Sequence, residues 1–240
     1  MALLEIAALL SIAAATAGGQ ADPARPLVLD VGCNDGVLLA AIAGRHIHID
    51  FVGLDWSPRL LYHAAGRVKG EKNVALVHAR AELIGEIFGP GELDEIWLFQ
   101  PEPMQLTTRV PTRLFDEPFL VACAGVLKAG GRLTLKTDHP GYYQWAAALL
   151  GAEPDARLAA QMRGEAKAKR KEFVDSGELP EPNAVVRGMF DISVNAADYW
   201  GDPGAQEATR GRAYFGAEST YEMRFKSKRL PIYLVELVRR

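Results

Sequence analysis

Short apolar runs alternate with amphipathic stretches along the first 140 residues. Five runs of strand length occur at Leu27 to Val31, Ile49 to Leu54, Val74 to Val77, Glu95 to Phe99 and Arg132 to Lys136. Helical patterns lie between them at Val37 to Arg45, Pro58 to Val68, Ala81 to Phe88 and Thr112 to Leu127, the last closed by Gly130 and Gly131. This alternation predicts an α/β fold with a doubly wound parallel sheet and a ligand crevice at the carboxyl ends of the strands.

Four further segments complete the expected organisation. A strand at Ala184 to Val194 and another at Pro231 to Val238 are expected to form a hairpin that closes a seven-stranded Rossmann-like sheet. The charged stretch Arg157 to Asp175, within an insertion at about 155–180, predicts a helix that is either a solvated surface helix or a lid or partner-binding arm. Met1 to Ala15 predicts an Ala/Leu-rich helix, so the chain divides into a segment 1–20 and a domain 21–240.

Two glycines four residues apart follow the first predicted strand, in the pattern Asp30-x-Gly32-x-x-x-Gly36, and Asp55 ends the second strand. This arrangement is typical of a nucleoside-cofactor site, since the glycines let the backbone pass close to the ligand and the acid accepts both ribose hydroxyls. The third glycine of a dinucleotide site is missing, and Asp30 suits a cationic ligand. The pattern favours S-adenosylmethionine; a tight turn without a ligand is the alternative.

The residues expected to contact this cofactor surround the glycine loop and the ends of the neighbouring strands. They are Asp30, Gly32, Cys33, Asn34, Gly36, Asp55, Trp56, Arg80, Ala81, Gln100 and Pro101. Trp56 is expected either to stack on the adenine or to pack against the sheet edge.

The composition limits the binding partners, cellular compartment and metal sites that are expected. The 240 residues carry a net charge of -3, which argues against a surface that grips a phosphate backbone everywhere and leaves room for local basic patches. Cys33 and Cys123 make no disulfide framework, which fits a reducing cytoplasm. The histidines at 46, 48, 63 and 78 lack metal-site spacing, so no metal is expected.

Three motifs follow one another in the second half of the chain: Pro101-Glu102-Pro103-Met104, then Gly130-Gly131 leading to Lys136-Thr137-Asp138, then Ser219-Thr220-Tyr221-Glu222. Together they resemble the bacterial tRNA (guanine-N7)-methyltransferase family, which carries Pro-Asp-Pro-Trp, a glycine pair before Lys-Thr-Asp, and Thr-x-Tyr/Phe-Glu. The resemblance covers about 27–143 and 219–236. It implies a class I fold that uses S-adenosylmethionine for N-methylation.

The resemblance also implies roles for single residues. Asp138, Ser219, Tyr221 and Glu222 would bind the acceptor ring, and Glu102 would lie beside the methyl donor, so that Glu102, Asp138 and Glu222 form the candidate catalytic set. A ring nitrogen with a free lone pair needs no strong base, and catalysis is then mostly positioning and electrostatics. Read from the residues alone, Asp138 with His139 has an alternative role as a helix cap, and Glu222 as a surface strand residue.

Two departures from the family shape the functional hypothesis. Residues 105–113 carry only two positive charges, at Arg109 and Arg113, where the family has a dense basic run. After the third strand, Arg80 stands where the family has an Asp, and Glu82 is expected to substitute for that Asp near the adenine. The leading hypothesis is therefore N-methylation of a small purine-like or azole-like heterocycle. The alternatives are tRNA (guanine-N7) methylation, with Arg163 to Lys171 replacing the basic run, and a non-catalytic binding protein.

Overall fold

The computed structural model describes residues 25–104, 109, 112–153, 158 and 179–240. The predicted helices at Met1 to Ala15 and Arg157 to Asp175 lie outside these residues, apart from Leu158. None of the helices in the described part of the chain is long and apolar enough to cross a membrane.

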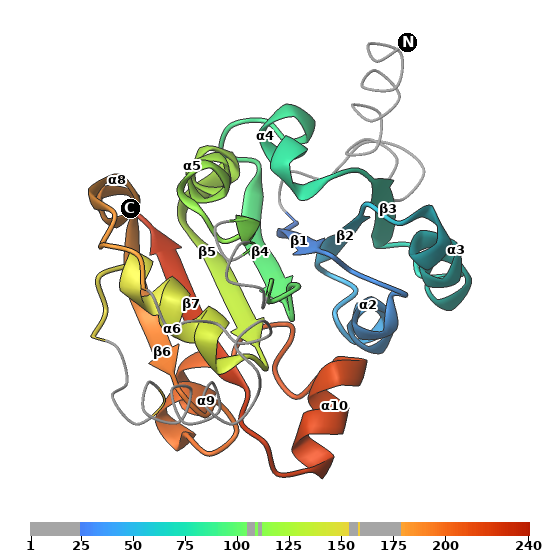
Figure 1. Ribbon diagram of the computed structural model, residues 1–240. Coiled ribbons are helices and arrows are strands. Elements are labelled where there is room, and N and C mark those ends of the chain that lie inside the picture. The colour runs from blue at the N-terminus through green and yellow to red at the C-terminus, as the bar shows by residue number, and fades with distance from the viewer. Residues whose placement is uncertain (1–24, 105–108, 110–111, 154–157, 159–178) are drawn as a thin grey trace.

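Seven strands form one sheet in the order β3-β2-β1-β4-β5-β7-β6. They are β1 (Leu27–Val31), β2 (Asp50–Asp55), β3 (Val74–His78), β4 (Leu93–Phe99), β5 (Leu127–Thr137), β6 (Phe190–Ala196) and β7 (Tyr233–Arg239). Strands β1 to β5 pair in parallel, whereas β7 runs antiparallel to both β5 and β6. The predicted doubly wound, seven-stranded α/β sheet is confirmed (Figure 1).

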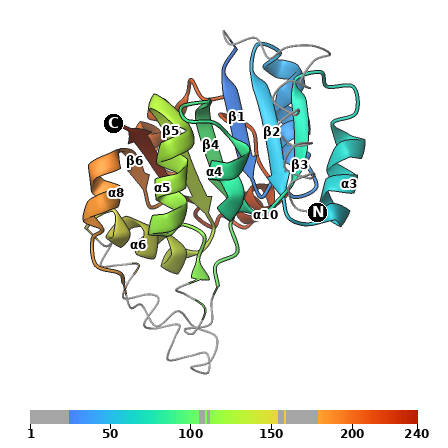
Figure 2. The ribbon, with the colours of Figure 1, turned by 90° about the horizontal axis from the view of Figure 1, so that it is seen from above.

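Helices cover both faces of this sheet. They are α2 (Val37–Ile42), α3 (Pro58–Arg67), α4 (Ile84–Ile87), α5 (Glu117–Val126), α6 (Pro140–Leu149), α8 (Ala184–Met189), α9 (Pro203–Thr209) and α10 (Thr220–Ser227), with 3-10 turns η1 (Ala43–Arg45) and η2 (Ala81–Leu83). Helices α4, α5, α6 and α8 lie along one face and share a core with it (Figure 2). Helices α2 and α3 and the segment around Tyr214 pack on the other face.

Side-chain caps fix where several helices begin. Ser57 accepts the N–H of Leu60 at the start of α3, and Asp116 accepts the N–H of Phe119 at the start of α5. Because Asp116 caps it, α5 begins at Glu117 and is shorter than the predicted helix from Thr112.

Two other boundaries differ from those predicted. The segment from Ala184 was expected to be a strand, but Asn183 accepts the N–H of Val186 and starts α8, so that β6 begins only at Phe190. Gly130 and Gly131 close no helix: they lie inside β5, opposite a register shift in β4. The last two strands are neighbours as expected, although α9 and α10 lie between them in the chain.

Candidate active site

A cavity of about 600 Å³ opens at the carboxyl ends of β1, β2 and β4. A smaller hollow of about 230 Å³ adjoins it, and Gly32 and Gln100 line both. The larger cavity extends toward Trp56 and Ala81, whereas the smaller one extends toward the first residues of α10. The two volumes therefore form one crevice at the edge of the sheet where the sequence predicted a ligand.

The two glycines of the loop after β1 have different structural roles. Gly32 has φ +74° and nothing lies within 4 Å of the position a Cβ would take, so its missing side chain keeps the crevice open. Gly36 also has a positive φ, +75°, but it lines neither cavity, and a Cβ there would lie 2.9 Å from the Cβ of Ala64. Gly36 therefore lets α2 approach α3, whereas Gly32 belongs to the crevice wall.

Asp55 connects the two strand ends that border the larger cavity. Its Oδ2 accepts the N–H of Asn34, 3.0 Å away, and its Oδ1 accepts the N–H of Ser57, 2.8 Å away. The carboxylate is thus held at the tip of β2 and lines the larger cavity. Two remaining lone pairs make it a preorganised acceptor for ligand hydroxyls.

Asp30 is a buried acid on the wall of the smaller hollow, with only 3% of its surface exposed. Burial, and secondarily the charge of Asp55, raise the pKa of Asp30 to about 7. Burial also raises the pKa of the neighbouring Cys33 thiol, so this cysteine stays protonated. A cation placed near Asp30 would favour its ionised form.

Gln100 joins β4 to α10 at the centre of the crevice. Its backbone has φ +47°, its N–H donates to the carbonyl of Lys136, and its Oε1 accepts the hydroxyl of Ser219 at 2.8 Å. Its Nε2 is buried and has no hydrogen-bond acceptor among the described residues. Between the two cavities there is accordingly an amide donor available to a ligand.

Lys136 and Glu222 form a fully buried ion pair, with 3.1 Å between Nζ and Oε1. The ammonium also lies over the rings of Phe99, Tyr199 and Tyr214, at 4.5 to 5.0 Å from their centroids. No role for Lys136 was expected from the sequence. Its position two residues before Asp138, near the end of a buried strand, was the available signal.

The other oxygen of Glu222 is also bonded. Its Oε2 accepts the N–H of Ser219 while the Ser219 hydroxyl accepts the N–H of Glu222, which makes a capping box at the start of α10. Glu222 lies on this helix and not on a strand, and it lines neither cavity. In this arrangement it holds Ser219 against Gln100.

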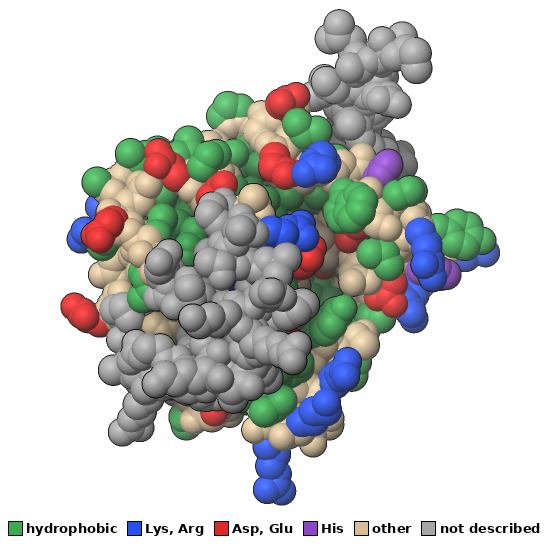
Figure 3. All heavy atoms as spheres, viewed as in Figure 1, with side chains coloured by type: hydrophobic (Ala, Val, Ile, Leu, Met, Phe, Trp, Pro, Cys, Tyr) green, Lys and Arg blue, Asp and Glu red, His purple; other side chains and the backbone are tan. Residues whose placement is uncertain are grey.

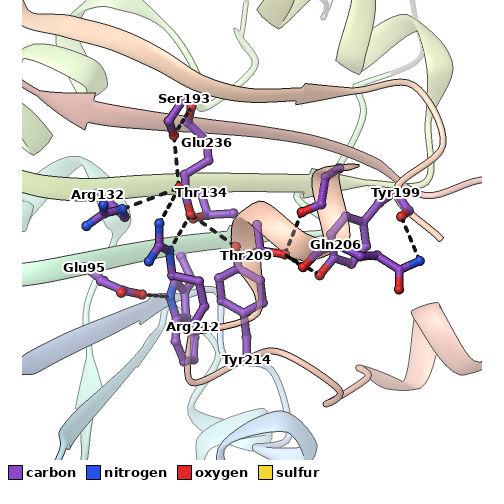
Figure 4. Close-up of polar contacts among 12 residues, drawn as sticks. Glu95, Arg132, Thr134, Ser193, Tyr199, Gln206, Thr209, Arg212, Tyr214 and Glu236 are labelled. Atoms are coloured by element: carbon purple, nitrogen blue, oxygen red, sulfur yellow. Dashed lines mark hydrogen bonds and ion pairs between the residues drawn. The ribbon is translucent and has the colours of Figure 1, made fainter. Parts of the chain in front are cut away.

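A second polar network supports the aromatic residues around Lys136 (Figure 4). Glu236 on β7 accepts two hydrogen bonds of 2.9 Å from Arg212 and further ones from Ser193 and Tyr214. The charge of Arg212 holds the pKa of Glu236 below its usual range although burial opposes this. The network fastens the Tyr214 segment to the sheet, against Phe99 and Lys136.

The remaining predicted residues lie at different distances from the crevice. Pro101, Glu102 and Arg80 line the larger cavity, and Arg80 pairs with the exposed Glu82 at 3.0 Å. Trp56 lines it with 71% of its surface exposed, and is therefore not packed against the sheet. A buried guanidinium, that of Arg113, holds the Pro101 to Pro103 segment by donating to the carbonyl of Pro103.

On the side of the smaller hollow, Cys33, Asn34, Ser219 and Tyr221 line the wall. Asp138 follows β5 and lines neither cavity, and burial raises its pKa. The helix cap at this place is His139, whose Nδ1 accepts the N–H of Tyr142 at 3.1 Å, so Asp138 is not needed as a cap.

The strand order, the open glycine turn and the acid at the tip of β2 define a Rossmann-like class I methyltransferase, a class that uses S-adenosylmethionine. The chain belongs to the family described as "Putative methyltransferase", whose model matches residues 24–174. The predicted class of enzyme and its cofactor are confirmed at this level.

The curated relatives carry a more specific name. The chain is 34% identical to a tRNA (guanine-N(7)-)-methyltransferase of Porphyromonas gingivalis over 127 residues, which are 52% of this chain and 51% of that protein. It is 37% identical to one of Chloroflexus aurantiacus over 135 residues, 55% of this chain and 60% of that protein. The chain thus spans about half to three fifths of these relatives' length, and the family resemblance is confirmed.

Solved structures support the fold alone. The 16S rRNA methyltransferase KamB superposes with a TM-score of 0.51 at 17% identity, covering 89% of this chain and 87% of that one. The antibiotic-resistance methyltransferase Kmr gives a TM-score of 0.50 at 17% identity, covering 89% and 86%.

The leading functional hypothesis from the sequence is wrong on this comparison. Methylation of a small purine-like or azole-like heterocycle has no support, since the relatives are named for tRNA guanine. The hypothesis rested on the few charges in residues 105–113, but phosphate contacts made by any segment near the crevice add to the affinity for a polyanion, so one segment does not decide the substrate. The small-molecule partner is withdrawn with it.

Proposed function

We propose that this protein transfers a methyl group from S-adenosylmethionine to N7 of a guanine in tRNA. The observation that carries the proposal is the crevice between the Gly32 turn and α10, lined by Asp55 and Gln100, in a chain whose curated relatives are named for this reaction. A small-molecule pocket typically has about 300–1,000 Å³, and the larger cavity has about 600 Å³.

The residues present fit the methyl donor. The Gly32 turn leaves open space, Asp55 offers acceptors for the ribose hydroxyls, and Asp30 supplies a negative charge on the side of the smaller hollow. Trp56 and Ala81 border the far end of the larger cavity, where a flat purine would lie against the indole. Gly36 supports this site from outside by bringing α2 against α3.

The acceptor would enter beside Gln100, between Glu102 on one rim and Ser219 and Tyr221 on the other. When bound, S-adenosylmethionine supplies an electrophilic methyl group on a sulfonium. The chain's own task is to exclude water and to align the guanine with that group, because N7 carries a free lone pair and needs no base. We assign Ser219 and Tyr221, which line the smaller hollow, to orienting the base. A contact between Asp138 and the base remains a prediction from the resemblance.

Glu102 and Glu222 act in different ways in this proposal. Glu102 is exposed on the larger cavity, where its carboxylate accepts donor groups of the base or favours the cationic donor. Glu222 is a positioning residue in the structure described, since both of its oxygens are engaged by Lys136 and Ser219. Direct contact between Glu222 and the base remains a prediction from the resemblance.

The test is methyl transfer to tRNA from a strain that lacks 7-methylguanosine. The purified chain, labelled donor and this tRNA are incubated, and digested nucleosides are separated by mass spectrometry. Label in 7-methylguanosine, dependent on Asp55, supports the proposal. Label in another nucleoside, or none in tRNA while the donor binds, overturns it.

A further inference from the structure

Helix α10 and the residues after it carry a concentration of positive charge next to the crevice. Residues 221–230 include four basic side chains, Arg224, Lys226, Lys228 and Arg229, and a single acid, Glu222, which is buried and paired with Lys136. Figure 3 shows blue side chains gathered over the region that α10 occupies in Figure 1.

Tyr221, Arg224 and Lys228 form a line along one face of α10 that starts at the mouth of the crevice. Tyr221 lines the smaller hollow and is 48% exposed, and Arg224 and Lys228 follow it at spacings of three and seven residues. Such spacings place side chains on one helix face. With a rise of about 1.5 Å per residue, Arg224 lies about 4.5 Å and Lys228 about 10 Å further along the axis.

Arg224 and Lys228 on this line, and Arg229 just after it, make no ion pair in the described part of the chain. All three side chains are exposed. Lys226 differs, because it pairs with Glu218 and lies 4.3 Å from the centre of the Trp200 ring. Arg224 and Lys226 lie in the last turn of α10, where the helix dipole also favours cations, whereas Lys228 and Arg229 follow the helix.

Because the chain carries a net charge of -3, a surface that binds phosphates has to be a local cluster of cations. We propose that Arg224, Lys228 and Arg229 contact backbone phosphates of the acceptor RNA, and that Tyr221 stacks on a base at the crevice mouth. An aromatic side chain followed by cations is the combination that binds a splayed nucleotide and its flanking phosphates. This inference rests on the proposed function and adds where the tRNA lies.

The opposite edge of the sheet provides a matched control. Arg45, Lys69 and Lys72 are also exposed, and they lie before β2 and β3, at the amino ends of the strands and away from the crevice. The variants R224Q/K228Q/R229Q and R45Q/K69Q/K72Q remove the same charge from the two edges. Both variants are expected to keep the donor affinity and the thermal stability of the wild type, and these two measurements serve as the check that they fold.

The measurement is the affinity for an unmodified tRNA transcript across a series of salt concentrations. Each lost phosphate contact lowers the salt-dependence slope by about 0.7–0.9, so the α10 variant should lose about 2 to 3 units of slope and bind at least about tenfold more weakly at low salt. The control variant should match the wild type.

The possible failures are distinguishable. If the wild type binds and methylates tRNA while the α10 variant keeps the full slope, or the control variant loses as much, the α10 surface is wrong and the proposed function stands. If the wild type neither binds nor methylates tRNA, both fall. Should the triple variant bind no donor, K228E alone is compared with K72E by the same criteria.

Discussion

The Nζ atom of Lys136 lies 3.1 Å from Oε1 of Glu222, and both side chains are buried although 86 positions separate them in the chain. Lys136 is the second-last residue of β5 and pairs with Phe99 of β4, and Glu222 lies in the first turn of α10. This ion pair therefore fixes the helix that forms one wall of the smaller hollow.

Removing one partner of this pair should destabilise the fold strongly. Glu222→Ala leaves a buried ammonium and opens the capping box, and we expect a loss of about 3–5 kcal/mol in the free energy of unfolding, measured in urea. The double variant Lys136→Met with Glu222→Leu should be less destabilised than either single change, because no unpaired charge remains. A double variant as unstable as the sum of the single ones would contradict the pairing.

The two loop glycines should separate stability from ligand binding. Gly36→Ala meets Ala64 at 2.9 Å and has an unfavourable φ, so about 2–4 kcal/mol of stability should be lost. Gly32→Ala meets nothing within 4 Å and should cost only about 1–2 kcal/mol, but its methyl group enters the crevice. Thermal unfolding and donor calorimetry on both variants check this; equal donor affinity in Gly32→Ala and wild type would refute its role.

Donor binding should strengthen with pH because of Asp30. With a pKa of about 7 in the folded protein, Asp30 is mostly protonated below pH 7. A cationic ligand that binds beside it has to displace this proton, so binding is weaker at low pH. If the pKa in the complex is well below 6, affinity for S-adenosylmethionine should be about tenfold higher at pH 8 than at pH 6. Calorimetry at the two pH values measures this, and Asp30→Asn should abolish the dependence.

The raised pKa of Asp30 also affects the free energy of unfolding, which should fall as the pH rises, whereas donor affinity increases. Since the pKa of Asp30 in the folded protein is raised above its ordinary value of 3.8, the folded state holds more protons than the unfolded state between pH 3.8 and about 7. The contribution of Asp30 is fully present below about pH 4 and is lost as the pH rises through about 7. The difference between the free energies of unfolding of the wild type and Asp30→Asn, measured in urea across this pH range, isolates the contribution. A difference that does not change with pH would contradict a raised pKa.

Asp55 should be the residue on which donor affinity depends most. Asp55→Asn replaces a charged acceptor of ribose hydroxyls, and two charge-assisted hydrogen bonds account for an affinity loss of about tenfold to several hundredfold. Asp191→Asn is the matched control, since Asp191 is exposed and pairs only with Arg240 among the described residues. Equal donor affinity in the Asp55 variant and this control would remove Asp55 from the site.

The parts of the site that depend on local backbone requirements were predictable from sequence. Gly32 and Gly36 are needed for positive φ, and an acid at the end of the second strand lies where the crevice of such a sheet must form. The Lys136–Glu222 pair was not predictable, because it joins residues distant in sequence and a motif reading treats Glu222 as a substrate contact. Likewise, the single cap at Asn183 decided that residues from Ala184 begin as a helix.

Crystals of the chain grown with S-adenosylhomocysteine test the site most directly. We predict that the ribose hydroxyls lie within hydrogen-bond distance of the Asp55 carboxylate, with the adenine beside Trp56 and the amino-acid part passing the Gly32 turn toward Asp30. A ligand bound outside the crevice, or a ribose that makes no contact with Asp55, would contradict the proposed donor site.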